Sequence, residues 1–287
     1  MNITDRTISE DSIWLSATPA EFAQTLPFYV TEAGFFITSN QYMIERQGNS
    51  GYLFLYTMKK FGKIKQNQHE FQLSENHAVI IDCSQPHSYG ASEDGWDFIW
   101  FWMDGNGVKA LFDILYLDGI SAINMCKYSQ LRTTMPELVQ KIMGNDVKSY
   151  LTLSAELHAL LNTMMSAALD NESDVQKKDY SEDIEKVLNF IKENYREQIT
   201  LDDMIKDIHI SKYHFIRLFR RVMGVTPYHY LTTFRINEAK TLLCTTDRNI
   251  AEIAFSCGFM DASQFIRHFK NYVGMKPFQY RSYFSQV

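Results

Sequence analysis

Long apolar runs are missing from this sequence of 287 residues. No stretch reaches the roughly 18 apolar residues that a membrane-spanning helix needs. The first residues, MNITDRTISEDS, also lack the basic start and apolar core of a secretory leader. Both absences predict a cytoplasmic protein without a membrane partner. With 45% apolar and 14% aromatic residues, the chain still has enough material for the cores of two ordinary domains.

Recurring motifs of metal binding and catalysis are missing as well. The four cysteines lie far apart without a Cys-x-x-Cys spacing, which argues against a zinc site and a disulfide framework. A redox switch through Cys83 or Cys257 is disfavoured, because neither has an evident basic neighbour to lower the pKa of its thiol. No P-loop, nucleophile elbow or GxGxxG occurs. The sequence therefore predicts no catalytic residue, no metal ligand and no cofactor.

An overall positive charge, a common property of nucleic-acid-binding proteins, is also lacking, because the formal net charge is −6. The charge is unevenly divided, however. Residues 1–180 hold 13 Lys and Arg against 22 Asp and Glu, whereas residues 181–287 hold 15 against 12. Residues 211–221 and 265–281 each carry four basic residues and no acidic one. A polyanion meets such local basic faces rather than the total charge.

Strand-like runs occupy the first part of the chain, up to about residue 105. Runs such as GYLFLYTM, FGKIKQNQHEFQL, HAVIIDC and WDFIWFWMDG alternate with turn-rich stretches such as SQPHSYGASEDG. This pattern predicts a small antiparallel β-barrel. From about Val108 the pattern becomes helical, and within residues 147–169 apolar residues recur near helical spacing, namely Leu151, Leu157, Leu161, Met164 and Met165. Such a stripe is typical of core packing, with a share of it available for a dimer surface.

Residues 171–180 lie in a polar, charged stretch with almost nothing to bury, which is typical of a linker. We therefore expect one domain in residues 1–170 and a second in residues 181–287. In the second domain nearly the same sixteen residues occur twice, as FIRLFRRVMGVTPYHY and FIRHFKNYVGMKPFQY. Each copy follows a short predicted helix, TLDDMIKDI or NIAEIAFSCGF, and a turn. Helix, turn and helix, twice over, predict two helix-turn-helix units.

Capping residues support these helix boundaries. Thr200 with Asp203 forms a predicted capping pair, and Ser211 and Asp261 are expected to cap the two repeated helices. Gly258 permits the left-handed backbone conformation that a tight turn demands. A third helix, beginning with a Thr-Pro cap at residues 226–227 and continuing to residue 243, joins the units. It would hold the two recognition helices apart by about 34 Å, one turn of DNA.

Each repeated helix has a predicted buried face and a predicted exposed face. Apolar residues at helical spacing define the buried faces, which are Phe215, Leu218, Phe219 and Val222 in the first copy and Phe265, Phe269 and Tyr272 in the second. The candidate DNA-binding residues lie opposite and differ between the copies: Lys212, Tyr213, Ile216, Arg217, Arg220, Ala262, Ser263, Ile266, Arg267 and Lys270. Two matched scaffolds with divergent surfaces suit the reading of two different short sequences.

Two arginines occupy matched positions on the exposed faces, Arg217 and Arg267. An arginine on a helix in the major groove can pair bidentately with guanine, which contributes about 1–3 kcal/mol of discrimination. Ile216 and Ala262 are suited to contact thymine methyl groups. Two alternatives stay open for each arginine, a solvated surface residue or a phosphate contact that carries no sequence information.

Together these features resemble the AraC/XylS family of bacterial transcription regulators, whose DNA-binding domain has two helix-turn-helix units of about this length. The residues of the second unit that carry the resemblance are IAEIA at 250–254, Gly258, Phe259, Ser263, Phe265, Arg267, Phe269, Lys270, Gly274, Pro277, Tyr280 and Arg281. Those of the first are Leu201, Ser211, Phe215, Arg217, Leu218, Phe219, Gly224, Pro227, Tyr230, Arg235 and Ala239. His209 departs from the pattern, because a small residue such as glycine is commoner in that turn.

The amino-terminal half resembles the cupin-type effector domain of the sugar-responsive members. The resemblance rests on GYLFLYTMKKFGK, on the turn PHSY at residues 86–89 and on the strand WDFIWF before Gly105. Matched to that pattern, five residues occupy places that line the ligand pocket of arabinose-responsive relatives: Lys59, His87, Tyr89, Phe98 and Trp100. Trp100 would stack on a sugar face, with plain core packing as its alternative.

The resemblance implies a two-domain α+β fold, with a cupin-like β-barrel, a helical dimerisation segment and a carboxyl-terminal all-α domain. It also implies a sugar-responsive activator of carbohydrate-utilisation genes. The expected partners are promoter DNA, a small-molecule effector, a second copy of the chain and RNA polymerase.

Two alternatives remain. A constitutive DNA-binding protein would use the barrel only to dimerise, because a packed barrel and a ligand-holding barrel show the same alternation. A metal-dependent cupin enzyme is disfavoured, because such enzymes need clustered histidines with a carboxylate, whereas His69, His77 and His87 stand singly.

Overall fold

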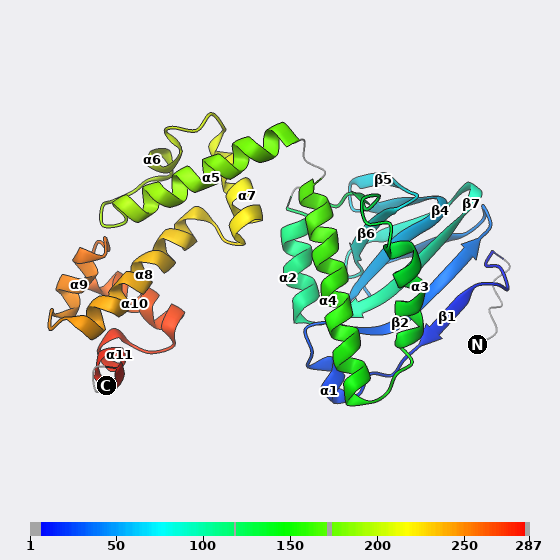
Figure 1. The fold of residues 1–287 in the computed structure, drawn as a ribbon, viewed down its shortest axis with the longest axis horizontal. Coiled ribbons are helices and arrows are strands. Elements are labelled where there is room, and N and C mark those ends of the chain that lie inside the picture. The colour runs from blue at the N-terminus through cyan, green and yellow to red at the C-terminus, as the bar shows by residue number, and fades with distance from the viewer. Residues whose placement is uncertain (1–6, 118, 171–173, 285–287) are drawn as a thin grey trace. The chain divides into compact units, whose positions relative to one another are not determined.

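The computed structural model describes residues 7–117, 119–170 and 174–284. The chain divides into two compact units, Met1–Ser173 and Asp174–Val287. The linker expected at residues 171–180 stays a prediction. Its first three residues lie outside the described ranges, and the described chain is helical from Asp174 onward. The predicted change from a sheet-rich to an all-helical half is confirmed (Figure 1).

Antiparallel strands form one eight-stranded sheet in the described part of the first unit. The strands are β1 (Ile13–Ser16), β2 (Tyr29–Thr38), β3 (Met43–Arg46), β4 (Tyr52–Gln66), β5 (His69–Ser74), β6 (His77–Asp82), β7 (His87–Asp104) and β8 (Ile123–Asn124). Their order is β1-β2-β7-β4-β6-β8, with β3 also paired to β7 and β5 also paired to β4. Along β4 the outer neighbour changes from β6 to β5, and along β7 it changes from β3 to β2. With these changes of partner the sheet takes the expected barrel-like form.

The two longest strands differ from the sequence prediction. GYLFLYTM and FGKIKQ, expected in separate strands, form the single strand β4. Lys60, within this strand, has a φ of 63° and lies beside an irregularity in the register. The stretch SQPHSYGASEDG, expected as a turn, enters β7 from His87 onward. Residues 87–90 of this stretch pair with β3 on one side and β4 on the other, which satisfies their backbone despite a poor strand propensity.

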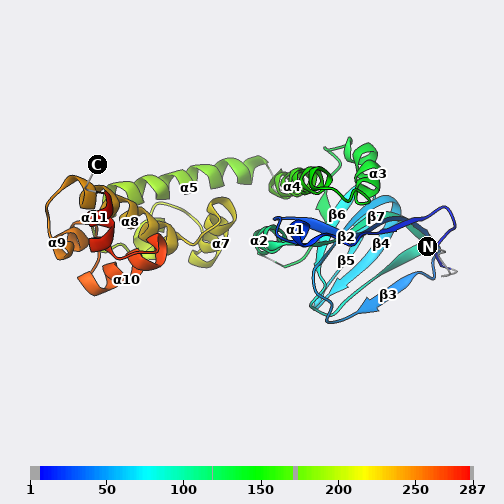
Figure 2. The ribbon, with the colours of Figure 1, turned by 90° about the horizontal axis from the view of Figure 1, so that it is seen from below.

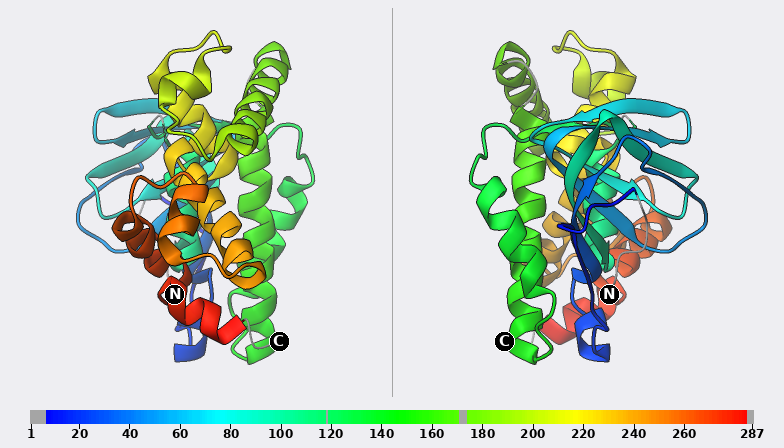
Figure 3. Two further views of the ribbon diagram at one scale, coloured as in Figure 1. Left: turned by 90° about the vertical axis from the view of Figure 1, so that its left-hand side faces the viewer. Right: turned by 90° about the vertical axis from the view of Figure 1, so that its right-hand side faces the viewer.

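Helices cover one face of the sheet. These are α2 (Asn106–Leu115), α3 (Leu131–Lys141) and α4 (Val147–Asp170), with the short α1 (Glu21–Gln24) beside α4. Figure 2 shows α3 and α4 on the side of the sheet opposite β3, and Figure 3 shows α4 in green along the sheet. Leu157, Leu161 and Met164 of α4 are buried against Phe54 and Phe101 of the sheet in one core. The predicted stripe is therefore mostly core, whereas Leu151 is 49% exposed.

A second core fills the concave side of the bent sheet. It consists mainly of residues from β4, β6 and β7 that alternate with those facing the helices, and it includes Leu53, Leu55, Tyr89, Phe98 and Trp100. Strand alternation explains the two cores, because successive side chains of one strand point to opposite faces.

The second unit contains seven helices in its described part: α5 (Asp174–Asn194), α6 (Leu201–Ile205), α7 (Lys212–Met223), α8 (Pro227–Thr245), α9 (Ile250–Ser256), α10 (Ala262–Val273) and α11 (Pro277–Phe284). They form two separate cores, one around α7 and one around α10. Helix α8 contributes to both. The predicted pair of helix-turn-helix units is confirmed, as α6 with α7 and α9 with α10.

The predicted helix caps are confirmed. Thr200 and Asp203 form a capping box at α6, and Ser211 accepts a hydrogen bond from the backbone N–H of His214 at α7. Asp261 accepts one from Gln264 at α10. These short-range contacts need only a few neighbouring residues, which is why the sequence shows them plainly.

Candidate nucleic-acid interface and effector site

The recognition helices α7 and α10 are built alike. The rings of Phe215 and Phe219 are 5.5 Å apart in the first, and those of Phe265 and Phe269 are 5.5 Å apart in the second. All four side chains are buried. Each helix ends at a left-handed glycine, Gly224 or Gly274. The repeat therefore encodes one scaffold twice.

One equivalent position in each helix contradicts the predicted buried face. Val222 and Tyr272, expected to pack inward, are 50% and 47% exposed. Both lie in the last turn of their helix, where the core is made instead by the next residue, Met223 or Val273. The ring of Tyr272 lies 5.1 Å from the ammonium nitrogen of Lys240, a contact at the surface.

The opposite faces carry the candidate DNA-binding residues. Six of these are exposed: Lys212, Tyr213, Arg220, Ser263, Arg267 and Lys270. The other four are partly buried: Ile216, Arg217, Ala262 and Ile266. Ala262 and Ile266 pack in part against the second core. The structure thus places all ten on the two recognition helices, on or beside the exposed face.

The two matched arginines have different surroundings. The guanidinium carbon of Arg217 lies 5.0 Å from the centre of the Tyr213 ring one turn earlier, a cation–π geometry. Arg267 is exposed at the corresponding place of α10. The charge of Lys212 is balanced by Asp202, at 2.6 Å from the lysine nitrogen to the nearer carboxylate oxygen. The first helix-turn-helix therefore has a partly buried arginine against a tyrosine ring, and the second has an exposed arginine.

The turns between the helices also differ. Gly258 has a φ of 81°, so the predicted left-handed turn is confirmed in the second unit. His209, the residue that departs from the family pattern, is not among the described residues with positive φ. The first unit makes its turn without a left-handed residue there, and α6 ends at Ile205. A histidine is acceptable in this turn because no backbone conformation demands glycine.

Three of the five candidate ligand-binding residues meet inside the bent sheet. Tyr89, Phe98 and Trp100 belong to the second core. Phe36 connects them, with ring distances of 5.7 Å to Phe98 and 5.2 Å to Trp100, and Tyr42 lies 6.4 Å from Tyr89. Burial raises the pKa of Tyr89 to about 12, so the hydroxyl stays protonated near neutral pH. We call this group of rings the aromatic interior.

Among the described residues, two buried polar atoms in or beside the aromatic interior have no hydrogen-bond partner. They are Nε2 of His87 and the indole nitrogen of Trp100, both fully buried. The other ring nitrogen of His87 lies 2.8 Å from the carbonyl oxygen of Gln85, and the His87 and Tyr89 rings are parallel. A buried polar group left unpaired costs about 1–3 kcal/mol, so each such group calls for an explanation. Lys59 is exposed on β4 and is not brought into this interior.

The amino-terminal arm supplies a further aromatic residue. The ring of Trp14, on β1, lies 6.1 Å from that of Trp100 and 6.2 Å from that of Phe36. Its indole nitrogen donates a hydrogen bond to Glu32 on β2. Trp14, Phe36 and Tyr42 were not predicted as site residues, because they come from segments that only strand pairing brings together: β1 pairs with β2, and both β2 and β3 pair with β7.

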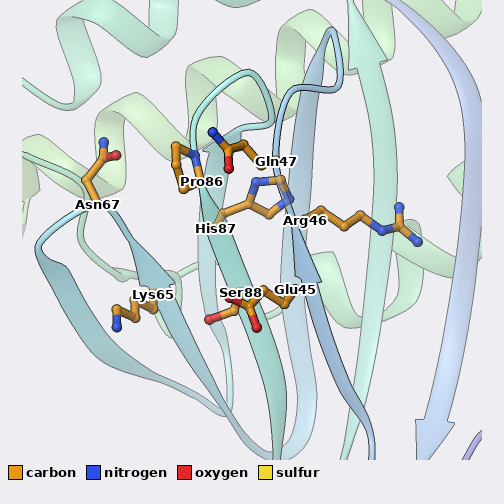
Figure 4. Close-up of a pocket in the computed structure, with 8 residues that line it drawn as sticks. All are labelled: Glu45, Arg46, Gln47, Lys65, Asn67, Pro86, His87 and Ser88. Atoms are coloured by element: carbon orange, nitrogen blue, oxygen red, sulfur yellow. The ribbon is translucent and has the colours of Figure 1, made fainter.

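A separate hollow of about 540 Å³ opens at the end of β3, β4 and β7 (Figure 4). Its lining residues are mostly polar: Glu45, Arg46, Gln47, Lys65, Asn67, Pro86, His87 and Ser88. Across the three strands, Ser88 of β7 pairs with Glu45 of β3 and with Lys65 of β4. His87 is the preceding residue of β7. Of the candidate ligand residues, His87 borders this hollow while Tyr89, Phe98 and Trp100 lie in the aromatic interior.

The buried thiols are poor nucleophiles. Burial raises the pKa of Cys83 to about 12 and that of Cys257 to about 11. The basic groups Arg46, near Cys83, and Arg196 and Arg235, near Cys257, act in the opposite direction but are outweighed. The expected lack of basic neighbours was therefore wrong, and desolvation is what keeps both thiols protonated near neutral pH.

Within residues 7–117, 119–170 and 174–284, no helix is both long and apolar enough to cross a membrane. Over the same ranges no cluster of three or more His, Cys, Asp or Glu side chains is arranged to hold a metal ion.

Comparison with known proteins identifies the family. Residues 29–172 match the family model of the AraC-like ligand binding domain, and residues 204–283 match that of a helix-turn-helix domain. The first match covers half of the chain, and the chain belongs to the AraC family of transcriptional regulators. The first match contains all five candidate ligand residues, and the second contains both recognition helices.

Two of the curated relatives are named as regulators of sugar operons. The melibiose operon regulatory protein of Escherichia coli is 39% identical over 98 residues, which span 34% of this chain and 32% of that protein. The lactose operon transcription activator of Staphylococcus xylosus is 26% identical over 75% of this chain and 78% of its own length. A further relative, AdaA of Bacillus subtilis, is a bifunctional transcriptional activator and DNA repair enzyme, 33% identical over 35% of this chain and 48% of its own length.

Proposed function

We propose that the chain is a DNA-binding transcriptional regulator, not an enzyme, that responds to a sugar and controls carbohydrate-utilisation genes. One observation carries the DNA-binding part. Helices α7 and α10 have matching buried faces and different exposed faces, and each helix bears an arginine at the same position, on or beside its exposed face. Recognition of two different short DNA sequences, which we call boxes, by one repeated scaffold accounts for this arrangement.

The sugar response rests on the aromatic interior. Aromatic faces stack on the apolar faces of sugars, and the unpaired nitrogens of His87 and Trp100 are suited to sugar hydroxyl groups. Two relatives are named as regulators of melibiose and lactose operons, which supports the same effector class. Within this proposal His87, Tyr89, Phe98 and Trp100 contact the effector. Lys59, which is exposed on β4, would contact the effector only from outside the aromatic interior.

Dimerisation through the helices of the first unit completes the proposal. Val147 and Leu151, in the first turns of α4, are exposed apolar residues that core packing does not use. A second copy would cover them. The effector would act through different affinities for two arrangements of the dimer, of which one reaches adjacent DNA sites.

A thermal-shift screen of the full chain against mono- and oligosaccharides tests the sensor. A sugar at a hundred times its dissociation constant adds about 2.7 kcal/mol to the free energy of unfolding. Trp100→Phe removes the unpaired N–H but keeps a ring, and we expect it to reduce the shift. The matched control is Trp102→Phe, because the indole of Trp102 already donates to the carbonyl of Ser50. A screen in which no sugar shifts the wild type would contradict the sensor.

A further inference from the structure

The two helix-turn-helix units have separate cores that meet along α8. Leu231 of α8 is buried in the first core, and Ile236, five residues later, is buried in the second. A single helix passing between two cores fixes their relative orientation only as well as that helix resists bending and twisting. Side contacts between the units therefore decide how rigid the pair is.

Arg235 makes such a contact at the junction of the two cores. Its Nε donates to the carbonyl oxygen of Tyr195 at 2.8 Å, and its Nη2 donates to that of Glu197 at 2.6 Å. Both carbonyls lie just beyond α5, on the first unit's side of the junction. The guanidinium carbon also lies 5.9 Å from the ring of Phe259, which is buried in the second core. One side chain thus contacts both units.

Gly258 brings the backbone of the second unit against the same segment. A Cβ at this position would lie 2.3 Å from the carbonyl oxygen of Tyr195 and 2.9 Å from two guanidinium nitrogens of Arg235. The side-chain amide of Gln198 donates to the carbonyl of Gly258 at 3.1 Å. The turn of the second helix-turn-helix therefore rests directly on the segment that leaves α5.

We infer that these groups, namely residues 195–198 with Arg235 and Gly258, form a seam that sets the spacing between the two DNA boxes read by one copy of the chain. The inference rests on the proposed DNA binding and goes beyond it. Successive major-groove faces repeat every 10–10.5 base pairs, or about 34 Å. A small rotation between the units therefore moves the second recognition helix to different base pairs.

The test begins with DNA duplexes selected from a random library by the wild-type full chain. In the selected duplex the segment between the two boxes is lengthened or shortened by one, two and five base pairs, and the dissociation constant is measured for each. Five added base pairs place the second box on the opposite side of the helix. The wild type should then lose on the order of 10- to 100-fold in affinity, the contribution of one arginine-to-guanine contact or more.

Arg235→Met removes both hydrogen bonds but keeps a long apolar side chain against Phe259. We expect this variant to bind the original spacing about tenfold more weakly and to bind all spacings within about threefold of one another, because the second unit then adds little at any spacing. Arg281→Met is the matched control. Arg281 donates to the carbonyls of Leu243 and Arg248 at 3.2 and 2.6 Å, entirely within the second unit. Its removal should leave the spacing profile steep.

Each outcome decides the inference. A wild-type spacing profile in Arg235→Met overturns it and leaves the DNA-binding proposal intact. Equal flattening in Arg281→Met also overturns it, because general loosening would then be the cause. If the wild type selects no sequence, the proposed function fails and the inference fails with it. Should Arg235→Met not fold, Gln198→Ala removes a single seam hydrogen bond, and an unchanged profile in that variant counts against the seam.

Discussion

The first and second helix-turn-helix units have equivalent aromatic cores, but the contacts around these cores differ. Phe219 meets Tyr230 at 5.8 Å in the first, and Phe269 meets Tyr280 at 5.5 Å in the second, both edge to face. In the first unit the hydroxyl of Tyr228 accepts a hydrogen bond from the backbone N–H of Leu201. The second unit has Phe278 at the corresponding place, and it is 69% exposed.

This difference separates the residues that core packing constrains from those that it leaves free to vary. The buried rings are alike because each unit must fill the same volume, and a core tolerates few changes of shape. The exposed positions and the turns diverge because packing does not constrain them. In the first unit the ring of Tyr213 lies against the guanidinium of the partly buried Arg217, whereas in the second unit Arg267 is exposed.

The largest expected effect comes from the shared cores. Phe219→Ala and Phe269→Ala each remove a fully buried ring and should each lower the free energy of unfolding by about 3–5 kcal/mol. Denaturant unfolding of the full chain measures both. If one substitution costs less than half of the other, the two cores are not equivalent and the comparison breaks.

Alanine should destabilise the second turn strongly and the first turn hardly at all. Gly258→Ala places a Cβ at a φ of 81° and against the carbonyl of Tyr195, which should cost about 2 kcal/mol or more of stability. His209→Ala should change stability by no more than about 0.5 kcal/mol, because His209 is exposed and its backbone is not left-handed. Thermal unfolding of both variants provides the measurement. Equal losses would show that the first turn depends on its histidine.

Loss of either recognition arginine should weaken specific DNA binding by a similar amount. Arg217→Ala and Arg267→Ala should each cost about 1–3 kcal/mol on the selected duplex and little on random DNA. Lys270→Ala should act more uniformly on both DNAs and reduce the dependence of binding on salt by about one ion. Equal losses on selected and random DNA in the arginine variants would assign them to phosphate contacts.

The smallest effect expected concerns the support of Arg217. Tyr213→Leu removes the ring beneath the guanidinium and should cost about 0.5–1 kcal/mol of binding to the selected duplex. In an Arg217→Ala background the same substitution should have almost no effect, because the ring then supports nothing. Tyr272→Leu is the control, since its ring contacts Lys240 and not a recognition arginine. A full effect of Tyr213→Leu without Arg217 would show that Tyr213 contacts DNA by itself.

Local features of the carboxyl-terminal half, residues 174–287, could be predicted from the sequence. The repeat reveals two equivalent helices, and caps such as Thr200 with Asp203 depend on residues three apart. The exceptions, Val222 and Tyr272, lie at helix ends, where spacing does not show how far the core extends. The seam could not be predicted, because Arg235 contacts carbonyl groups 38 and 40 residues away.

Less of the sheet-rich amino-terminal half was predictable, because strand pairing joins segments that are distant in the sequence. Tyr89, Phe98 and Trp100 were matched to a family pattern and do meet in one core, but Trp14 joins them only because β1 pairs with β2. Lys59 follows the same alternation in sequence yet lies exposed, since the irregular register at residues 57–62 changes which side chains face inward. A bulge of this kind has no clear signal in a single sequence.

Repeating the DNA selection with Arg217→Ala and with Arg267→Ala tests most directly whether two unlike surfaces read two unlike boxes. The account predicts that each variant loses the base preference in one box and keeps it in the other, and that the affected box differs between the variants. The same box affected in both, or unchanged preferences in both, would contradict it.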